Sequence, residues 1–192
     1  MNIIAITRPD FFSGETELAG RLFDCGLTRL HLRKPHGTEQ QLAEWIEDIS
    51  PEYRRRIVIH DHFELARRFG LGGIHLNSRN PLPPSDSDGL SISMSCHSIE
   101  EVRTRKDECG YLFLSPIYDS ISKEGYGSAF QREVLEKAAS EGIIDKKVYA
   151  LGGVSLEHID ELRALGFGGA AVLGALWQSD DPTAYLKALL EA

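Results

Sequence analysis

Short apolar runs alternate with amphipathic stretches along almost the whole chain, and this alternation limits the fold more than any other feature. The runs are three to five residues long and are bounded by polar residues or glycine, which is typical of buried parallel strands. Eight such runs predict eight strands. They lie at Ile3–Ile6, Leu30–Leu32, Ile57–Ile59, Gly73–Leu76, Leu90–Met94, Tyr111–Leu114, Val148–Leu151 and Ala170–Leu173.

Helical periodicity fills most of the intervals between these runs. In the first interval, for example, Leu18, Leu22 and Cys25 fall on one helical face. Helices are predicted at Glu15–Cys25, Thr38–Ile49, Phe63–Phe69, Ile99–Glu108, Gln131–Ala139, Leu156–Leu165 and Pro182–Leu190. Strands that alternate with helices in this way predict an α/β protein with a closed (β/α)₈ TIM barrel. An open flavodoxin-like sheet is the rival fold, but it normally needs only five or six strands.

The barrel must be compact. Its 192 residues leave about 24 for each of eight units, slightly fewer than this fold usually has. The segment Asn77–Gly89 contains three prolines and has no helical period, so the helix after the fourth strand is expected to be shortened or missing. No linker or shift in composition divides the chain, and we expect a single domain over residues 1–192.

Composition excludes several classes of protein. Acidic residues outnumber basic ones by 29 to 21, which argues against nucleic-acid binding but leaves room for a small phosphorylated substrate. No apolar run approaches the ~18 residues of a membrane span, and the N-terminus does not look like a signal peptide. Three cysteines without CxxC spacing fit free thiols in the cytoplasm.

Polar residues gather where the predicted strands end. Barrel enzymes keep their active sites at the C-terminal ends of the strands, and five of the seven histidines fall at such positions. We therefore expect a substrate site there, built from side chains that include His31, Arg33, His60, Asp61, Ser95 and His97.

Two further segments point to anion binding. Gly152 and Gly153 follow the seventh strand and Gly174 follows the eighth, where barrel enzymes often hold a phosphate through backbone N–H groups. We favour phosphate binding; the alternative is that these glycines only form tight turns. Ser120, Ser122 and Lys123 follow the sixth strand and are suited to a second anionic group such as a diphosphate, unless the loop is only a polar surface segment.

The pair His60 and His62 resembles the HxH motif of metal hydrolases, because residues two apart on a strand share a face. In those hydrolases the pair usually follows the first strand, whereas here it follows the third. We therefore favour hydrogen-bonding roles for these two histidines, with a zinc hydrolase as an alternative.

The motifs together resemble the thiamine phosphate synthase superfamily, which includes the TenI-like thiazole tautomerases. The resemblance rests on the ordered set IIAIT, LHLRK, IVIHDH, GGIHLNSRN, SMSCHS, LFLSPIYDSISKEGYG, YALGGV and AAVLGAL. It implies a (β/α)₈ barrel. It also implies an enzyme that condenses hydroxymethylpyrimidine diphosphate with thiazole phosphate, releasing diphosphate with the help of Mg²⁺.

The family pattern is only partly kept on the second strand. Its Gln-x-Arg-x-Lys motif falls on His31, Arg33 and Pro35. The resemblance thus implies a catalytic Arg33 and a substrate-binding His31. Lys34 is one position out of register, so on a strand it should point to the opposite face from Arg33.

The metal site that the resemblance implies is weakened. The family's Asn-Asp pair after the third strand falls on His60 and Asp61, and its second metal aspartate falls on Asn80. Asp61 and Asn80 are therefore the implied Mg²⁺ ligands, with one carboxylate where the family has two.

The anion-binding loops are better preserved. Ser120, Ser122 and Lys123 match the family's Thr-x-Thr-Lys, which implies a catalytic Lys123. Thiazole phosphate binding is implied for Gly152, Gly153, Leu173 and Gly174, although the family's serine at position 174 is lost.

Two other functions remain open within the resemblance. His97 stands where the tautomerases carry a histidine for proton transfer, so an isomerase is the first alternative. The second is a non-catalytic sensor of thiamine intermediates, which would keep the phosphate site and tolerate a weakened metal site. The sequence leaves homo-oligomerisation open.

Overall fold

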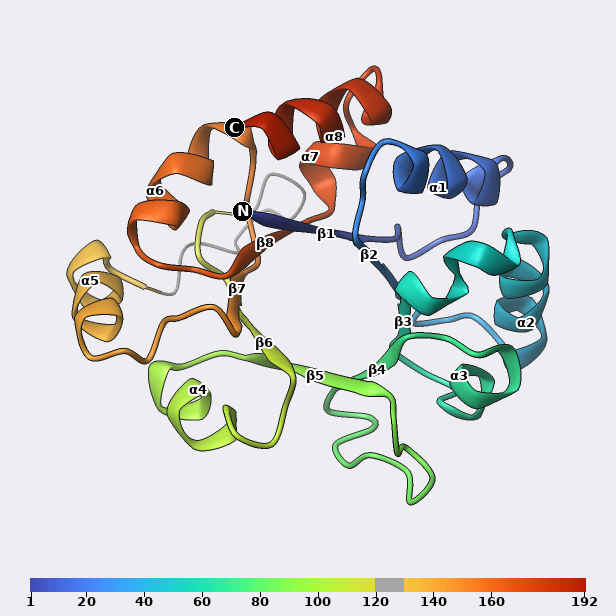
Figure 1. The fold of residues 1–192 in the computed structure, drawn as a ribbon, viewed down its shortest axis with the longest axis horizontal. Helices are drawn as coiled ribbons and strands as arrows, with labels where there is room; N and C mark the ends of the chain where they lie inside the picture. The colour runs from blue at the N-terminus through green and yellow to red at the C-terminus, as the bar shows by residue number, and fades with distance from the viewer. Residues whose placement is uncertain (120–129) are drawn as a thin grey trace.

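The computed structural model describes residues 1–119 and 130–192. Eight parallel strands form a closed barrel in chain order, with β8 paired to β1 (Figure 1). The strands are β1 Asn2–Ile6, β2 Arg29–Leu32, β3 Ile57–Ile59, β4 Gly73–Leu76, β5 Ser91–Cys96, β6 Tyr111–Leu114, β7 Val148–Ala150 and β8 Gly169–Val172. The predicted TIM barrel is confirmed.

Helices surround the barrel and cover the outer faces of the strands (Figure 1). The α-helices are α1 Glu15–Asp24, α2 Glu39–Asp48, α3 Glu64–Phe69, α4 Ile99–Arg105, α5 Arg132–Ser140, α6 Ile159–Ala164, α7 Gly174–Trp177 and α8 Pro182–Glu191. Two 3₁₀ turns accompany them, η1 Pro51–Arg56 and η2 Leu156–His158. The sequence pattern missed α7 and η1, because one or two helical turns are too short to show a period. No helix in these ranges is long and apolar enough to cross a membrane.

No helix connects β4 to β5, as the prolines predict. The connection is an irregular loop that projects outward from the barrel (Figure 1). Asn77 organises its first turn, because its Oδ1 accepts the backbone N–H groups of Arg79 and Asn80. Its Nδ2 donates to the backbone carbonyl of His60 at 2.6 Å. The turn therefore fixes residues 79 and 80 beside the end of β3.

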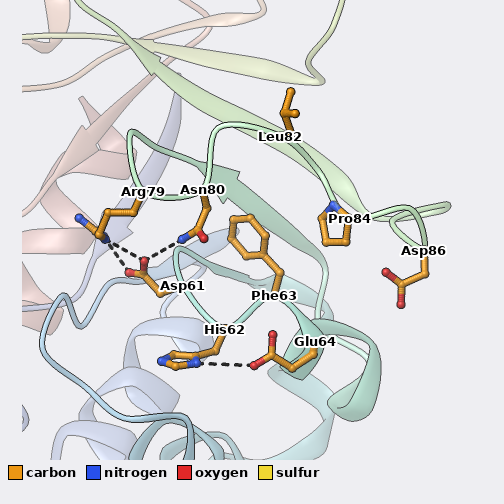
Figure 2. A pocket seen from close by; sticks show the side chains of 9 residues that line it. All are labelled: Asp61, His62, Phe63, Glu64, Arg79, Asn80, Leu82, Pro84 and Asp86. Atoms are coloured by element: carbon orange, nitrogen blue, oxygen red, sulfur yellow. Dashed lines mark hydrogen bonds and ion pairs between the residues drawn. The ribbon is translucent and has the colours of Figure 1, made fainter.

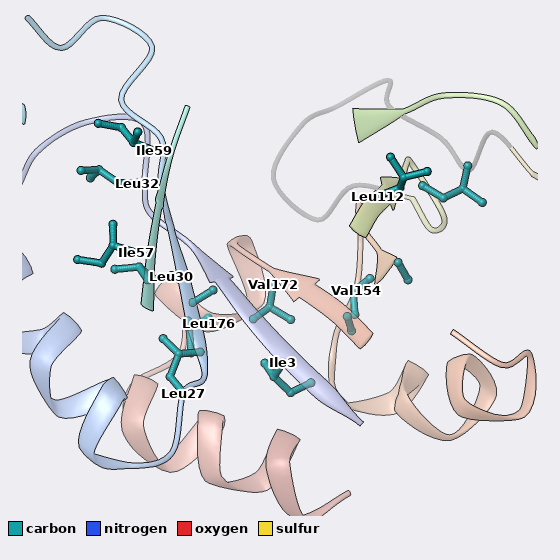
Figure 3. Packing of buried hydrophobic residues seen from close by; sticks show 14 of the residues in the cluster. Ile3, Leu27, Leu30, Leu32, Ile57, Ile59, Leu112, Val154, Val172 and Leu176 are labelled. Carbon is teal, nitrogen blue, oxygen red and sulfur yellow. The ribbon is translucent and has the colours of Figure 1, made fainter. Parts of the chain in front are cut away.

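The barrel separates two apolar cores. The larger core lies between the strands and the helices and contains outward-facing residues such as Ile3, Leu30 and Ile57 (Figure 3). The smaller one lies inside the barrel and contains Ile4, Ile6, Tyr111, Phe113 and Ala171. Strand alternation explains the division, because neighbouring residues on a strand point to opposite faces.

Lys34 illustrates the same alternation at the end of β2. Its side chain is buried against α1 and away from the barrel interior, as its register predicts. Its Nζ donates to both carboxylate oxygens of Glu15 at 2.7 Å and to the carbonyls of Arg8 and Asp10. Burial raises the pKa of Glu15 and lowers that of Lys34, so each group depends on the other to remain charged. This ion pair fastens the loop after β1 to the end of β2.

Breaking this pair should destabilise the fold. Glu15→Ala leaves a buried ammonium with two carbonyl acceptors, and we expect a loss of about 3 kcal/mol in the free energy of unfolding. Glu17→Ala, at an exposed position in the same helical turn, is the matched control and should cost far less. Urea denaturation measures both. Equal effects would show that the Lys34–Glu15 pair does not stabilise the protein.

Candidate active site

A network of histidines fills one side of the barrel interior, directly below the C-terminal ends of the strands. The Nδ1 atom of His31 lies 2.9 Å from Nε2 of His60, and its Nε2 lies 2.5 Å from the Tyr111 hydroxyl. His75 bonds through its two ring nitrogens to the hydroxyls of Ser93 and Ser95, at 2.9 and 3.0 Å. All three histidines are buried.

The hydrogen-bond partners fix the protonation of His75. The Ser93 hydroxyl donates its proton to the carbonyl of Ile74. We therefore assign the proton of His75 to Nδ1, which donates to Ser93, while Nε2 accepts from Ser95. Burial lowers the pKa of His75 to about 3 and holds the pKa values of His31 and His60 well below their usual range. The three imidazoles are therefore neutral at neutral pH.

These histidines form a hydrogen-bonded network that needs no metal ion. One ring nitrogen from each lies within 4.8 Å of the others, a spacing that a metal site also shows. However, both ring nitrogens of His31 and of His75 already have protein partners. The network therefore satisfies its buried polar groups by itself.

His60 and His62 do not converge, as the zinc alternative would require. His62 has a φ of 54°, so the strand alternation ends before it. Its Nδ1 lies 3.5 Å from Glu64, on the side of the loop away from the barrel interior (Figure 2). His60 points inward to His31 instead.

Arg33 enters the mouth of the barrel from the end of β2. Its backbone is held at both polar groups by Thr7, whose hydroxyl accepts from the Arg33 N–H at 2.9 Å and donates to the Arg33 carbonyl at 3.1 Å. Its half-buried guanidinium forms no hydrogen bond or ion pair with any other described residue. Burial and the neighbouring Arg79 lower the pKa of Arg33, whereas Asp61 raises it. Arg33 therefore interacts electrostatically with both of these charged groups.

Asp61 is paired with a second guanidinium. Nε and Nη2 of Arg79 donate to the two carboxylate oxygens of Asp61 at 3.1 and 2.9 Å. The Nδ2 atom of Asn80 donates to the same carboxylate at 3.0 Å. Figure 2 shows Arg79 and Asn80 converging on Asp61 from the loop after β4. Beside them lies a cleft of about 600 Å³, which Phe63 and Leu82 also line.

As they lie, these residues do not fit a resident Mg²⁺ ion. The only carboxylate among the implied ligands is neutralised by Arg79, and Asn80 turns its N–H₂ group toward that carboxylate. Mg²⁺ requires oxygen ligands and prefers carboxylates whose charge is not already matched. Asn80 alone predicts a weakened Mg²⁺ site. Arg79, a basic residue that the family motifs do not include, weakens the site further by neutralising Asp61.

His97 and Ser115 lie at the ends of β5 and β6. The Nδ1 atom of His97 lies 3.0 Å from the Ser115 carbonyl, which can only accept. We therefore assign the proton to Nδ1, which leaves Nε2 as the acceptor. His97 is exposed, so this nitrogen is available as a base at the mouth.

Gly152 and Gly153 follow β7 with φ values of 91° and 65°. A Cβ at Gly153 would lie 2.3 Å from the Asp119 carbonyl oxygen, and one at Gly152 would lie 2.8 Å from Pro116. Both glycines are therefore required for packing against the segment after β6, whatever ligand they contact. After the neighbouring strand β8, Leu173 is the N-cap of the short helix α7 and Gly174 its first residue, and the first N–H groups of this helix have no partner within it.

The remaining predicted residues fall into three groups. Ser95 contacts His75 and reaches the mouth only in part. His31 is fully buried, so any effect on a substrate passes through His60. Ser120, Ser122 and Lys123 lie outside the described residues. Sequence reasoning missed Thr7, Arg79 and Tyr111; only Arg79 carried a signal, since it adjoins the position of the family's metal aspartate.

The comparisons with known proteins decide the family. A family model for thiamine monophosphate synthase matches residues 3–176. The chain belongs to the thiamine monophosphate synthase family. A thiamine-phosphate synthase of Serratia proteamaculans is 30% identical over 186 residues, which are 91% of this chain and 87% of that protein. The one from Photorhabdus laumondii subsp. laumondii is 29% identical over 182 residues, 89% of this chain and 84% of that protein.

A solved structure supports the same family. The thiamine phosphate pyrophosphorylase from Bacteroides thetaiotaomicron superposes with a TM-score of 0.91 at 42% identity, covering 100% of this chain and 96% of that one. The thiamine phosphate pyrophosphorylase from Pyrococcus furiosus has a TM-score of 0.81 at 19% identity, which shows the shared fold. The resemblance drawn from the sequence motifs is confirmed.

The buried histidines of this family member should make its stability fall in mild acid. In the folded protein the pKa values of these histidines lie below the unfolded value of about 6.5. Below pH 6.5 the histidines therefore bind protons in the unfolded chain but not in the folded one. Each neutral histidine should cost about 1.4 kcal/mol per pH unit in this window. Urea denaturation between pH 7 and pH 5 measures the slope. His75→Gln should reduce it by about a third, and the exposed His36→Gln should not; equal slopes in both variants would contradict the assignment.

Proposed function

We propose that this chain is a transferase of thiamine biosynthesis that condenses hydroxymethylpyrimidine diphosphate with thiazole phosphate. The observation that carries the proposal is the charge at the barrel mouth. Arg79 binds the carboxylate of Asp61 through two hydrogen bonds and Arg33 interacts electrostatically with both, so these three side chains carry one net positive charge. A diphosphate leaving group requires positive charge at that point.

The proposed reaction has two bond changes. The C–O bond between the pyrimidine methylene and the diphosphate breaks, and its electron pair leaves with the diphosphate. The thiazole nitrogen then donates its lone pair to the methylene carbon and forms the C–N bond of thiamine phosphate. Arg33 binds the leaving oxygens, and Lys123 is proposed to do the same from the loop after β6.

The other residues position the substrates. The N–H groups near Gly152, Gly153 and Gly174 are proposed to bind the thiazole phosphate on the opposite side of the mouth. The neutral His60, held by His31, offers a hydrogen-bonding edge to the pyrimidine. The partners are therefore small phosphorylated molecules, and we propose that the enzyme works in the cytoplasm, where its free thiols would persist.

The thiamine phosphate synthases of this family are generally dependent on Mg²⁺, but Asp61 and Asn80 are not arranged here to hold it. No step of the reaction above is therefore assigned to a metal ion.

The test of the proposed function is product formation from the two precursors. Purified protein should yield thiamine phosphate, and Arg33→Gln should reduce the rate by about 100-fold, because it removes charge that matters most as the diphosphate leaves. The control is Arg68→Gln, whose side chain lies on α3 near Glu39 and Glu47, away from the mouth. Absence of thiamine phosphate with and without Mg²⁺ would refute the proposal.

A thiazole tautomerase is the second candidate, favoured by the geometry of His97. Its Nε2 is a free acceptor at the mouth, as a proton-transfer base requires. If this function holds, His97→Ala should slow isomerisation of the thiazole phosphate by ~100-fold, while His36→Ala should not. Proton exchange observed by NMR measures the rate. An unchanged rate in His97→Ala would remove His97 from the mechanism.

A further inference from the structure

The loop after β4 carries a basic side chain in the position where the family resemblance leads one to expect a metal ion. Arg79 makes a two-point contact with Asp61 through Nε and Nη2. The turn organised by Asn77 fixes the backbone of this arginine. Arg79 is thus built into the site.

We propose that the Arg79 guanidinium takes the place of a divalent metal ion and supplies the charge that binds the diphosphate group. This inference rests on the proposed function, because it concerns the leaving group of that reaction. Two consequences can be tested without the reaction: diphosphate binds to this chain without a metal ion, and Arg79 is required for that binding.

The geometry leaves Arg79 able to bind an anion while it holds Asp61. A guanidinium has five N–H donors, and its contact with Asp61 occupies only Nε and Nη2. Nη1 forms no hydrogen bond with any residue in the described ranges. The side chain is 50% exposed, whereas Asp61 is 15% exposed, so the outer edge of the guanidinium faces the cleft. Asp61 therefore orients Arg79 and leaves one edge free.

The local charges favour an anion over a cation. Arg79 contacts Asp61 at 2.9 Å, and Arg33 interacts electrostatically with both, so these three side chains carry a net charge of plus one. The other two carboxylates that line the cleft, Glu64 and Asp86, lie away from Arg79 (Figure 2), close to His62 and Arg67 respectively. A divalent cation at Asp61 would be repelled by two guanidiniums, whereas a diphosphate would be attracted by both. Guanidinium groups also match phosphate oxygens through paired hydrogen bonds.

The rival explanation is a latch. In that case Arg79 only neutralises Asp61 in the free protein, and Mg²⁺ displaces it when the substrate arrives. The two explanations predict opposite effects of removing Arg79. If Arg79 binds the anion, its loss weakens diphosphate binding. If Arg79 is a latch, its loss frees Asp61 for the metal ion and leaves metal-free binding unchanged.

Titration calorimetry with inorganic diphosphate distinguishes them. In the presence of EDTA, the wild-type protein should bind diphosphate, and Arg79→Gln should weaken binding at least tenfold. Arg79→Lys, which keeps the charge but not the paired geometry, should lie between the two, and Arg68→Gln should bind like the wild type. Undetectable binding by the wild type in EDTA, or equal binding by Arg79→Gln, would overturn the proposal.

A double variant tests the substitution for the metal ion directly. Arg79→Gln combined with Asn80→Asp places two unpaired carboxylates at the mouth, and its diphosphate binding should recover only when Mg²⁺ is added. Recovery without Mg²⁺, or none with it, would overturn the claim that the guanidinium occupies the position of a metal ion. Because inorganic diphosphate needs no condensation, failure of the proposed function would appear separately, as intact diphosphate binding without thiamine phosphate formation.

Discussion

Closure of the barrel is the constraint on which every feature of the site depends. The pairing of β1 with β8 joins the two ends of the sheet, with Ile4 opposite Ala171. Because all eight strands run parallel, their C-terminal ends form one ring. Residues as distant in sequence as Arg33, His97 and Gly174 therefore lie at the same end of the barrel. Residues just below that end lie inside a closed sheet that has no free edge.

The closed interior explains how polar side chains can pack inside this barrel. TIM barrels are usually packed with layers of branched apolar residues, whereas here three histidines and two serines occupy part of the space. Burial keeps the imidazoles neutral, and hydrogen bonds among them replace the water that they lose. The register of the strands makes this possible, because His75, Ser93 and Tyr111 lie on neighbouring strands at the same level. The network thus gives His60 a fixed orientation at the base of the mouth.

Two guanidiniums add positive charge to the part of the mouth where the family motif leads one to expect a cation. One carboxylate with an adjacent amide would be a weak cation site, but here the Asp61 carboxylate is matched by Arg79, and Arg33 interacts electrostatically with both. Lys34, one residue from Arg33, contributes nothing to this charge, because it faces α1 and is matched by Glu15. Strand alternation therefore decides which basic side chains act at the mouth.

The sequence by itself determined the barrel, its missing helix and most of the ring of residues around the mouth. These features depend on local rules: short apolar runs form strands, prolines prevent a helix between β4 and β5, and alternation separates Arg33 from Lys34. Only the tertiary structure decided the partners of those residues. The pairing of Asp61 with Arg79 and of His31 with Tyr111 joins residues that are 18 and 80 positions apart. No spacing in the chain encodes such contacts, because they arise from the register of neighbouring strands and from a turn whose shape Asn77 sets.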